Sequence, residues 1–203
     1  MKILVTAFEP FGGENINPAQ VAVMQLPDEL NGVTIVKKVL PTVFDKSVEL
    51  LCEMLADEQP DAVISIGQAG GRAGITVERV AINIDDARMP DNDGNTREDR
   101  PIKPGGPAAY FSTLPVKAIV AALKESGIPA AVSDSAGTFV CNHVMYAALH
   151  YAATNQPGLL AGFVHIPYLP SQTVEKPNMP SMSEENVLAG LKAIISVVGV
   201  VLP

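Results

Sequence analysis

Short runs of β-branched residues alternate with longer amphipathic stretches along almost the whole chain, and this alternation constrains the fold most strongly. Five runs have the composition of strands: 2–8, 33–40, 61–67, 130–136 and 159–167. Helical patterns lie among them, at 18–26, 47–58, 115–127, 141–153 and 183–198. We therefore expect an α/β domain whose mostly parallel central sheet is covered by helices on both faces. Ligands of such sheets bind beyond the carboxyl ends of the strands.

Composition and charge narrow the class of protein. The 203 residues are 47% hydrophobic and 18% charged, which is typical of a globular chain, and no linker divides them, so we expect a single domain over 1–203. The formal net charge of -8 makes nucleic acid and anionic membranes poor partners. The first apolar run stops at Glu9 and is too short for a signal peptide or a membrane span, so a cytoplasmic protein is expected.

One segment interrupts the alternation. Residues 75–84 have the pattern of a further strand, and they lead into 85–107, which is rich in proline and has no hydrophobic period. A loop of this length in a compact domain is usually functional or disordered. We expect it either to cover the site or to make contacts between subunits.

The chain has only two cysteines, Cys52 and Cys141, which excludes a disulfide framework and paired zinc knuckles. Cys52 lies among the apolar residues of helix 47–58 and is expected in the core. Cys141 falls in the first turn of helix 141–153, where unpaired amides and the helix dipole favour a thiolate and hence a nucleophile. The alternative is that Cys141 is a small buried hydrophobe.

A nucleophilic thiol needs an imidazole within reach, and the chain has three histidines. His143 is two residues from Cys141 on the same helix and points to a different face, and His150 lies more than two turns further on. His165 ends strand 159–167, at the rim where the site of the sheet is expected. It is therefore the candidate base, unless it is a strand-end histidine with a purely structural partner.

A third group should orient that imidazole. The period of two in 75–84 puts Glu78 on the same side as Val80, Ile82 and Ile84, and a carboxylate on an apolar face is costly without a partner. Glu78 is thus the candidate for the third role. The alternative is a structural salt bridge between Glu78 and its neighbour Arg79.

The glycine-rich stretches do not have the spacing of phosphate-binding loops. "GQAGGRAG" departs from the dinucleotide fingerprint and leads into a strand, "FEPFGG" lacks the lysine of a P-loop, and "DNDGN" has its glycine out of place for a calcium loop. No cofactor and no metal site are expected. Phe8 and Phe11 flank the first glycine turn, either as an aromatic clamp for a flat ligand or folded back on the core.

Four segments together resemble the pyroglutamyl peptidase I family, also called pyrrolidone-carboxylate peptidases: "VTAFEPFGG", "GQAGGRAGITVERVAIN", "SAGTFVCNHVMY" and "GFVHIPYLP". The resemblance covers nearly the whole chain. It implies an α/β/α sandwich and a cytosolic cysteine peptidase, commonly a tetramer, that removes an N-terminal pyroglutamyl residue from peptides without a cofactor. It assigns Cys141 as nucleophile, His165 as base and Glu78 as the third member.

The same resemblance places Phe8, Phe11 and Gln68 around the lactam ring of the substrate and Arg88 near the reacting carbonyl. Two features depart from the family: Ala7 stands where glycine is usual, and the chain ends at Pro203, earlier than many members. Two other classes remain alternatives. One is a binding module that kept the pocket and lost turnover, and the other is an enzyme acting on a nucleotide or phosphate.

Overall fold

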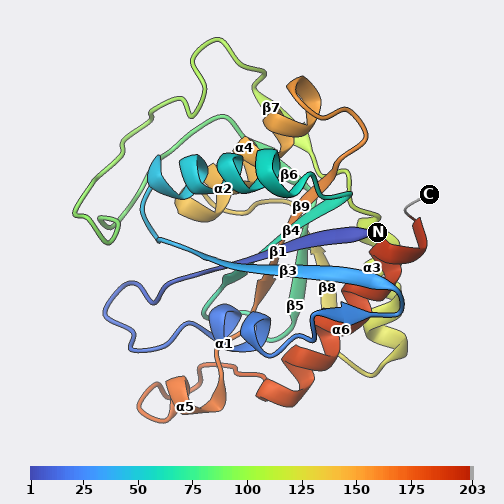
Figure 1. The fold of residues 1–203 in the computed structure, drawn as a ribbon. Helices are drawn as coiled ribbons and strands as arrows, with labels where there is room; N and C mark the ends of the chain where they lie inside the picture. The colour runs from blue at the N-terminus through green and yellow to red at the C-terminus, as the bar shows by residue number, and fades with distance from the viewer. Residues whose placement is uncertain (202–203) are drawn as a thin grey trace.

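A seven-stranded sheet runs through the centre of the computed structural model, which describes residues 1–201 (Figure 1). Its strands are β1 (Lys2–Phe8), β2 (Glu29–Leu30), β3 (Val33–Leu40), β4 (Ala62–Gln68), β5 (Ile75–Glu78), β8 (Ala130–Ser133) and β9 (Leu160–Ile166). They lie in the order β2-β3-β1-β4-β9-β5-β8, and β6 (Val80–Ile82) pairs with β7 (Ala109–Phe111) in a separate two-stranded sheet. Residues 202 and 203, including Pro203, lie outside the described part.

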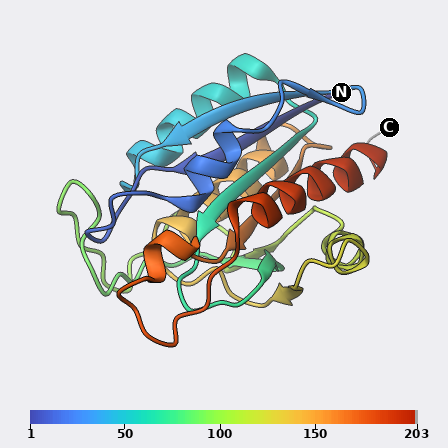
Figure 2. The same ribbon diagram turned by 90° about the horizontal axis from the view of Figure 1, so that it is seen from below.

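Helices cover both faces of the sheet, as Figures 1 and 2 show. They are α1 (Pro18–Met24), α2 (Lys46–Glu58), α3 (Val116–Glu125), α4 (Val140–Thr154), the short α5 (Pro170–Thr173) and α6 (Glu184–Val201). Two of them, α2 and α4, pack on one face, and α1, α3 and α6 pack on the other. The expected α/β/α arrangement with a mostly parallel sheet is confirmed.

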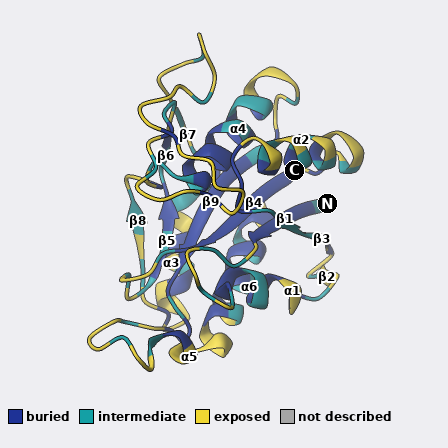
Figure 3. Cartoon of the chain, turned by 90° about the vertical axis from the view of Figure 1, so that its left-hand side faces the viewer, coloured by how far each residue is buried: buried dark blue, intermediate teal, exposed yellow. Residues whose placement is uncertain are grey.

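The central strands are buried because helices lie on both sides of them (Figure 3). Every residue of β4 is buried, and neighbouring residues of β1 serve opposite faces: Ile3 packs toward α1 and α6, and Leu4 toward α2 and α4. Strands buried on two faces read as continuous apolar runs, and for this reason the bounds of β1 agree with those expected from sequence. β3 also has its expected bounds, although it is only partly buried and contains Lys37 and Lys38.

The direction of the strands decides which side chains meet. β3, β1, β4 and β9 are parallel, so their carboxyl ends lie at one edge of the sheet. β5 runs antiparallel to β9, with Thr76 opposite His165 and Val77 opposite Val164. Because alternate residues of a strand share a face, Thr76 and Glu78 lie on the same face of the sheet as His165.

The expectation of one continuous strand over 75–84 is wrong. The chain leaves the main sheet at Arg79, whose N–H donates to the carbonyl of Ser133 (2.8 Å) and whose carbonyl accepts from the N–H of Ser112 (2.8 Å). Glu78 therefore ends β5 in the main sheet, whereas Val80 begins β6 in the small one. The shared face proposed for Glu78 and the residues after Arg79 does not exist.

The segment after β6 is tied to the body of the protein around the entrance to α2. The carboxylate of buried Asp91 accepts from the backbone N–H groups of Phe44 (3.0 Å) and Asn95 (2.8 Å), and Asn92 donates its backbone N–H to the carbonyl of Thr42 (3.0 Å). Closer to α4, the N–H of Asp86 donates to the carbonyl of Thr138 (3.0 Å). These bonds hold 85–107 against the entrance to α2 and the start of α4, and the two functions proposed for this segment stay predictions.

We predict that Asp91→Ala loosens this loop, because several backbone N–H groups lose a buried acceptor. The free energy of unfolding should fall by about 1–3 kcal/mol, and trypsin should cut faster within 85–107. Urea denaturation and limited proteolysis measure these two effects.

The matched control is Asp93→Ala. Asp93 is two residues away, but its side chain is exposed and pairs only with the exposed Lys46. An equal acceleration of cleavage in both variants would contradict the anchoring function of Asp91.

Candidate active site

Cys141 lies at the start of α4, over the carboxyl edge of the sheet. The helix begins at Val140, and no side chain caps its first turn, so the first backbone N–H groups of α4 point away from the helix without a capping partner. A methyl group placed on Gly67 would lie 3.1 Å from the Cys141 sulfur. Because Gly67 of β4 is paired with His165 of β9, the thiol lies at the strand pair that carries the candidate base.

His165 and Glu78 form a buried hydrogen-bonded pair. The imidazole Nδ1 lies 2.8 Å from the Oε1 atom of Glu78, and the two residues are 3% and 0% exposed. A carboxylate can only accept, so Nδ1 carries the proton, which leaves Nε2 of the neutral ring with a free lone pair. Phe163 packs against the imidazole, with ring centroids 4.8 Å apart.

Burial and charge set the protonation of this pair. Burial, together with the charge of Arg72, lowers the pKa of His165 below its ordinary value against the opposite effect of Glu78. For Glu78, burial alone would raise the pKa, but His165, Ser133 and Arg72 together outweigh burial and lower it. At neutral pH the site therefore holds a carboxylate and a neutral imidazole.

The pKa of the Cys141 thiol differs from the one expected at a helix N-terminus. Although the residue is only half-buried, desolvation raises the pKa of the Cys141 thiol to about 12, and the negative charge of Glu78 acts in the same direction. The helix N-terminus does not offset these two effects, so the prediction of a thiolate at rest is wrong. The thiol and the imidazole beside the β4–β9 strand pair are therefore both neutral at rest.

The alternative partner proposed for Glu78 is also wrong. Arg79 pairs at the surface with Asp134 (2.9 Å), whereas Nη1 of Arg72 lies 2.7 Å from the Oε1 atom of Glu78. Sequence reasoning missed Arg72. Its only signal was a cation in the glycine-rich turn that leads into β5.

The remaining histidines have partners of their own. Nδ1 of His143 lies 2.8 Å from the Oδ2 atom of buried Asp85, and Nδ1 of His150 lies 2.9 Å from the hydroxyl of Tyr110. His143 is therefore held by Asp85 of the segment 85–107 and not by Cys141, as expected.

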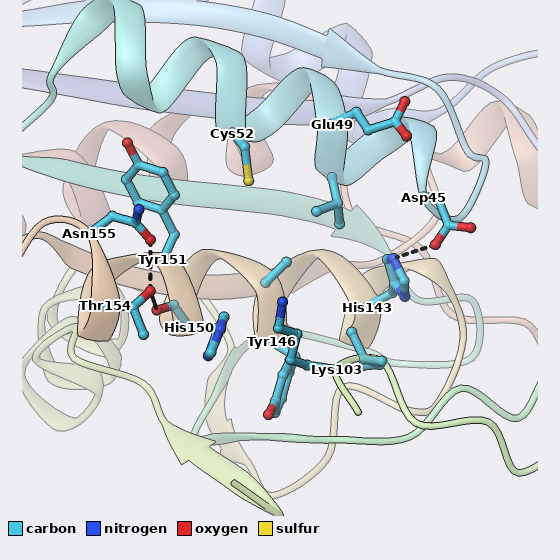
Figure 4. A pocket seen from close by; sticks show the side chains of 13 residues that line it. Asp45, Glu49, Cys52, Lys103, His143, Tyr146, His150, Tyr151, Thr154 and Asn155 are labelled. Atoms are coloured by element: carbon cyan, nitrogen blue, oxygen red, sulfur yellow. Dashed lines mark hydrogen bonds and ion pairs between the residues drawn. The ribbon is translucent and has the colours of Figure 1, made fainter. Parts of the chain in front are cut away.

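A cavity of about 460 Å³ lies between α2 and α4 (Figure 4), apart from this site. His143, His150 and Cys52 line it, but Cys141, His165 and Glu78 do not. Cys52 is thus half-buried at the wall of a cavity, and not in the closed core where we expected it. Burial raises the pKa of its thiol.

A second cavity, about 350 Å³, lies immediately before α4. It is lined by Asp86, Arg88, Met89, Gly137, Thr138 and Phe139. Phe11 packs against Phe139 of this lining, at 6.1 Å between ring centroids, whereas Phe8 is buried against Phe163 of β9 at 6.0 Å. Arg88 thus lines a cavity that reaches Phe139, two residues before Cys141.

The side chain of Gln68 is directed elsewhere. Gln68 follows Gly67 in β4 and so points to the opposite face of the sheet, where its Oε1 accepts a hydrogen bond from Gln172 (2.9 Å). Its contact with a ligand beside Cys141 remains a prediction.

Within residues 1–201, no helix is long and apolar enough to cross a membrane, and no three potential metal ligands cluster.

Comparison with known proteins identifies the family. A sequence model described as pyroglutamyl peptidase matches residues 1–200. The chain belongs to the pyroglutamyl peptidase family. It is a cysteine peptidase of the pyrrolidone-carboxylate peptidase type, and hence a hydrolase.

Its relatives match over almost their whole length. The pyrrolidone-carboxylate peptidase of Alkaliphilus oremlandii is 56% identical over 195 residues, which are 96% of this chain and 92% of the relative. The crystal structure of pyroglutamyl peptidase I from Bacillus amyloliquefaciens superposes with a TM-score of 0.95 at 48% identity, covering 98% and 95% of the two chains. A mutant pyrrolidone carboxyl peptidase from Pyrococcus furiosus gives 0.96 at 47% identity, with both chains fully covered. The fold of this pyroglutamyl peptidase family member is thus the fold of its solved relatives.

We predict that Gly67→Ala impairs the site by crowding it. The added methyl group would lie 2.7 Å from the Phe163 ring and 3.1 Å from the Cys141 sulfur. Stability should fall by about 1–3 kcal/mol, and kcat for a peptidase substrate should fall as the thiol is displaced. Urea denaturation and steady-state kinetics measure both.

The control is Gly199→Ala. A methyl group there would lie 2.8 Å from Val33, at the far end of β3, so it adds crowding away from the site. Its kcat should equal that of the wild type. Wild-type kcat in the Gly67 variant would contradict the described position of the thiol.

Proposed function

We propose that this protein hydrolyses the bond after an N-terminal pyroglutamyl residue of peptides, through a thioester on Cys141. The observation that carries this proposal is the buried hydrogen bond between His165 and Glu78 beside the thiol at the start of α4. The substrate class is supported by the family model and by the names of the relatives, pyrrolidone-carboxylate peptidase and pyroglutamyl peptidase I.

Acylation begins with proton transfer, because the thiol is neutral at rest. Nε2 of His165 takes the proton of Cys141 as the sulfur attacks the carbonyl carbon of the pyroglutamyl group. Uncapped N–H groups in the first turn of α4 stabilise the oxyanion, and the carboxylate of Glu78 stabilises the imidazolium. The imidazolium then protonates the leaving nitrogen, the C–N bond breaks, and the shortened peptide departs.

Deacylation repeats these transfers with water. Nε2 of His165 takes a proton from a water molecule, whose oxygen attacks the thioester carbonyl. The C–S bond breaks, and the sulfur regains a proton from the imidazolium as free pyroglutamate leaves. Glu78 keeps Nδ1 protonated in both stages, so the same lone pair acts each time.

The cavity before α4 suits an uncharged acyl group. Phe11 packs against Phe139 of the cavity lining and offers an aromatic face for a flat ring, and Arg88 lies on the cavity wall. The family resemblance adds Phe8 and Gln68 to the proposed binding residues. A pyroglutamyl ring has no ammonium group, so no carboxylate is needed to bind it. The proposal also includes a cytoplasmic homotetramer, as the family resemblance implies.

The test is release of aminomethylcoumarin from its pyroglutamyl derivative, with the prolyl derivative as a control substrate. The wild type should cleave only the first, and Cys141→Ala should lower kcat by about 10⁴-fold or more while remaining folded by circular dichroism. Cys52→Ala is the matched cysteine control and should keep wild-type activity. Undiminished turnover in Cys141→Ala would end the thiol proposal, and a folded wild type without turnover would favour the binding module.

The pH profile should follow His165. Because burial lowers the pKa of this imidazole below 6.5, the base remains unprotonated at pH 7 and is lost only as the pH falls through that lowered pKa. The acidic limb of kcat/KM is therefore expected below pH 6.5, measured with the same substrate in buffers of constant ionic strength. A limb above 6.5 would show that the imidazole is not desolvated as described.

A further inference from the structure

Arg72 is the charged neighbour of the site that the mechanism above does not use. The Oε1 atom of Glu78 lies 2.7 Å from Nη1 of Arg72 and 2.8 Å from Nδ1 of His165, so one carboxylate oxygen accepts from both. The other oxygen, Oε2, is buried and has no hydrogen-bond partner among residues 1–201. Arg72 is thus the only cation with a direct contact to the Glu78 carboxylate in the described part of the chain, apart from His165 when protonated.

The guanidinium group is held in place by several contacts. Nη1 also donates to the hydroxyl of Thr76, and Nη2 donates to the carbonyl oxygen of Ser135 (3.3 Å). The turn that carries Arg72 is closely packed at Gly74, where a methyl group would lie 2.5 Å from the carbonyl oxygen of Pro129. With 31% of its side chain exposed, Arg72 stands between solvent and the buried carboxylate.

We propose that Arg72 is a positioning residue that holds Glu78 against His165 through the carboxylate oxygen that both contact. This inference rests on the proposed function, because it assigns Arg72 a part in the same reaction. Arg72 acts through Glu78 and does not itself touch the reacting atoms. Its Nη1 shares Oε1 with Nδ1 of His165, so the carboxylate attracts the imidazole proton less strongly than an unshared carboxylate would.

The charges around His165 agree with this assignment. Glu78 faces it from β5, Arg72 from the turn before β5 and the Cys141 thiol from α4, while the paired residue of β4, Gly67, carries no charge. The positive charge of Arg72 lowers the pKa of both His165 and Cys141. Loss of Arg72 should therefore make His165 more basic and the thiol harder to deprotonate.

The variants Arg72→Met and Arg72→Lys test the proposal, with Arg79→Met as the matched control. Arg79 is adjacent to Glu78 in sequence, but it pairs only with the exposed Asp134. With the pyroglutamyl substrate, Arg72→Met should lower kcat about 10- to 100-fold with KM within about twofold, and should move the acidic limb of kcat/KM up by about one pH unit. Arg72→Lys should keep kcat and the pH of the acidic limb close to their wild-type values, and Arg79→Met should change neither.

A second readout does not depend on turnover. The pKa of His165, measured by NMR titration of the folded protein, should be higher in Arg72→Met than in the wild type or in Arg79→Met. An unchanged His165 pKa and pH limb in a folded Arg72→Met variant would overturn the proposal, whatever happens to kcat. Equal loss of kcat in the Met and Lys variants with no shift of the limb would show a merely structural residue and also overturn it. If the wild type lacks turnover, the proposed function fails, and the titration still decides on Arg72.

Discussion

The hydrogen bond between His165 and Glu78 is the interaction on which the rest of the site depends. It joins two side chains that are almost fully buried, at 2.8 Å between Nδ1 and Oε1. Burial of an ionised carboxylate costs free energy unless charges and hydrogen bonds compensate for the lost solvent, so this position requires hydrogen-bond donors on the same face of the sheet. His165 and Arg72 are those donors, and together they keep Glu78 ionised and the imidazole in one tautomer.

The architecture of the sheet makes this bond feasible. β5 enters antiparallel to β9, which places Glu78 on the face of His165 at the carboxyl edge of the parallel strands. α4 begins above the same edge, and the missing side chain of Gly67 leaves room for the Cys141 sulfur. Residues that are far apart in sequence thus meet because β5 runs opposite to its neighbour β9 in a mostly parallel sheet.

The sequence predicted those parts of the structure that depend on local pattern. The apolar run of β1 and the β-branched run of β3 have the expected bounds. The strand-end position of His165 and the helix-start position of Cys141 follow from periodicity and from the helix that begins there. Short elements such as β7 and α5 carry too few residues to show a period. The break at Arg79 and the direction of β5 depend on partners elsewhere in the chain, Ser112 and Ser133 among them, which no local pattern shows. The pKa of the thiol was misjudged for the same reason, because desolvation by packed neighbours exceeds the effect of the helix terminus.

The central claim is that a neutral Cys141 becomes acylated with His165 as its base. Rapid-quench mass spectrometry of the protein mixed with a pyroglutamyl substrate tests it most directly. We expect a transient mass increase of one pyroglutamyl group, located on the peptide that contains Cys141, absent from Cys141→Ala and formed far more slowly in His165→Ala. Substrate turnover without any covalent intermediate in the wild type, or the added group on Cys52, would contradict the account.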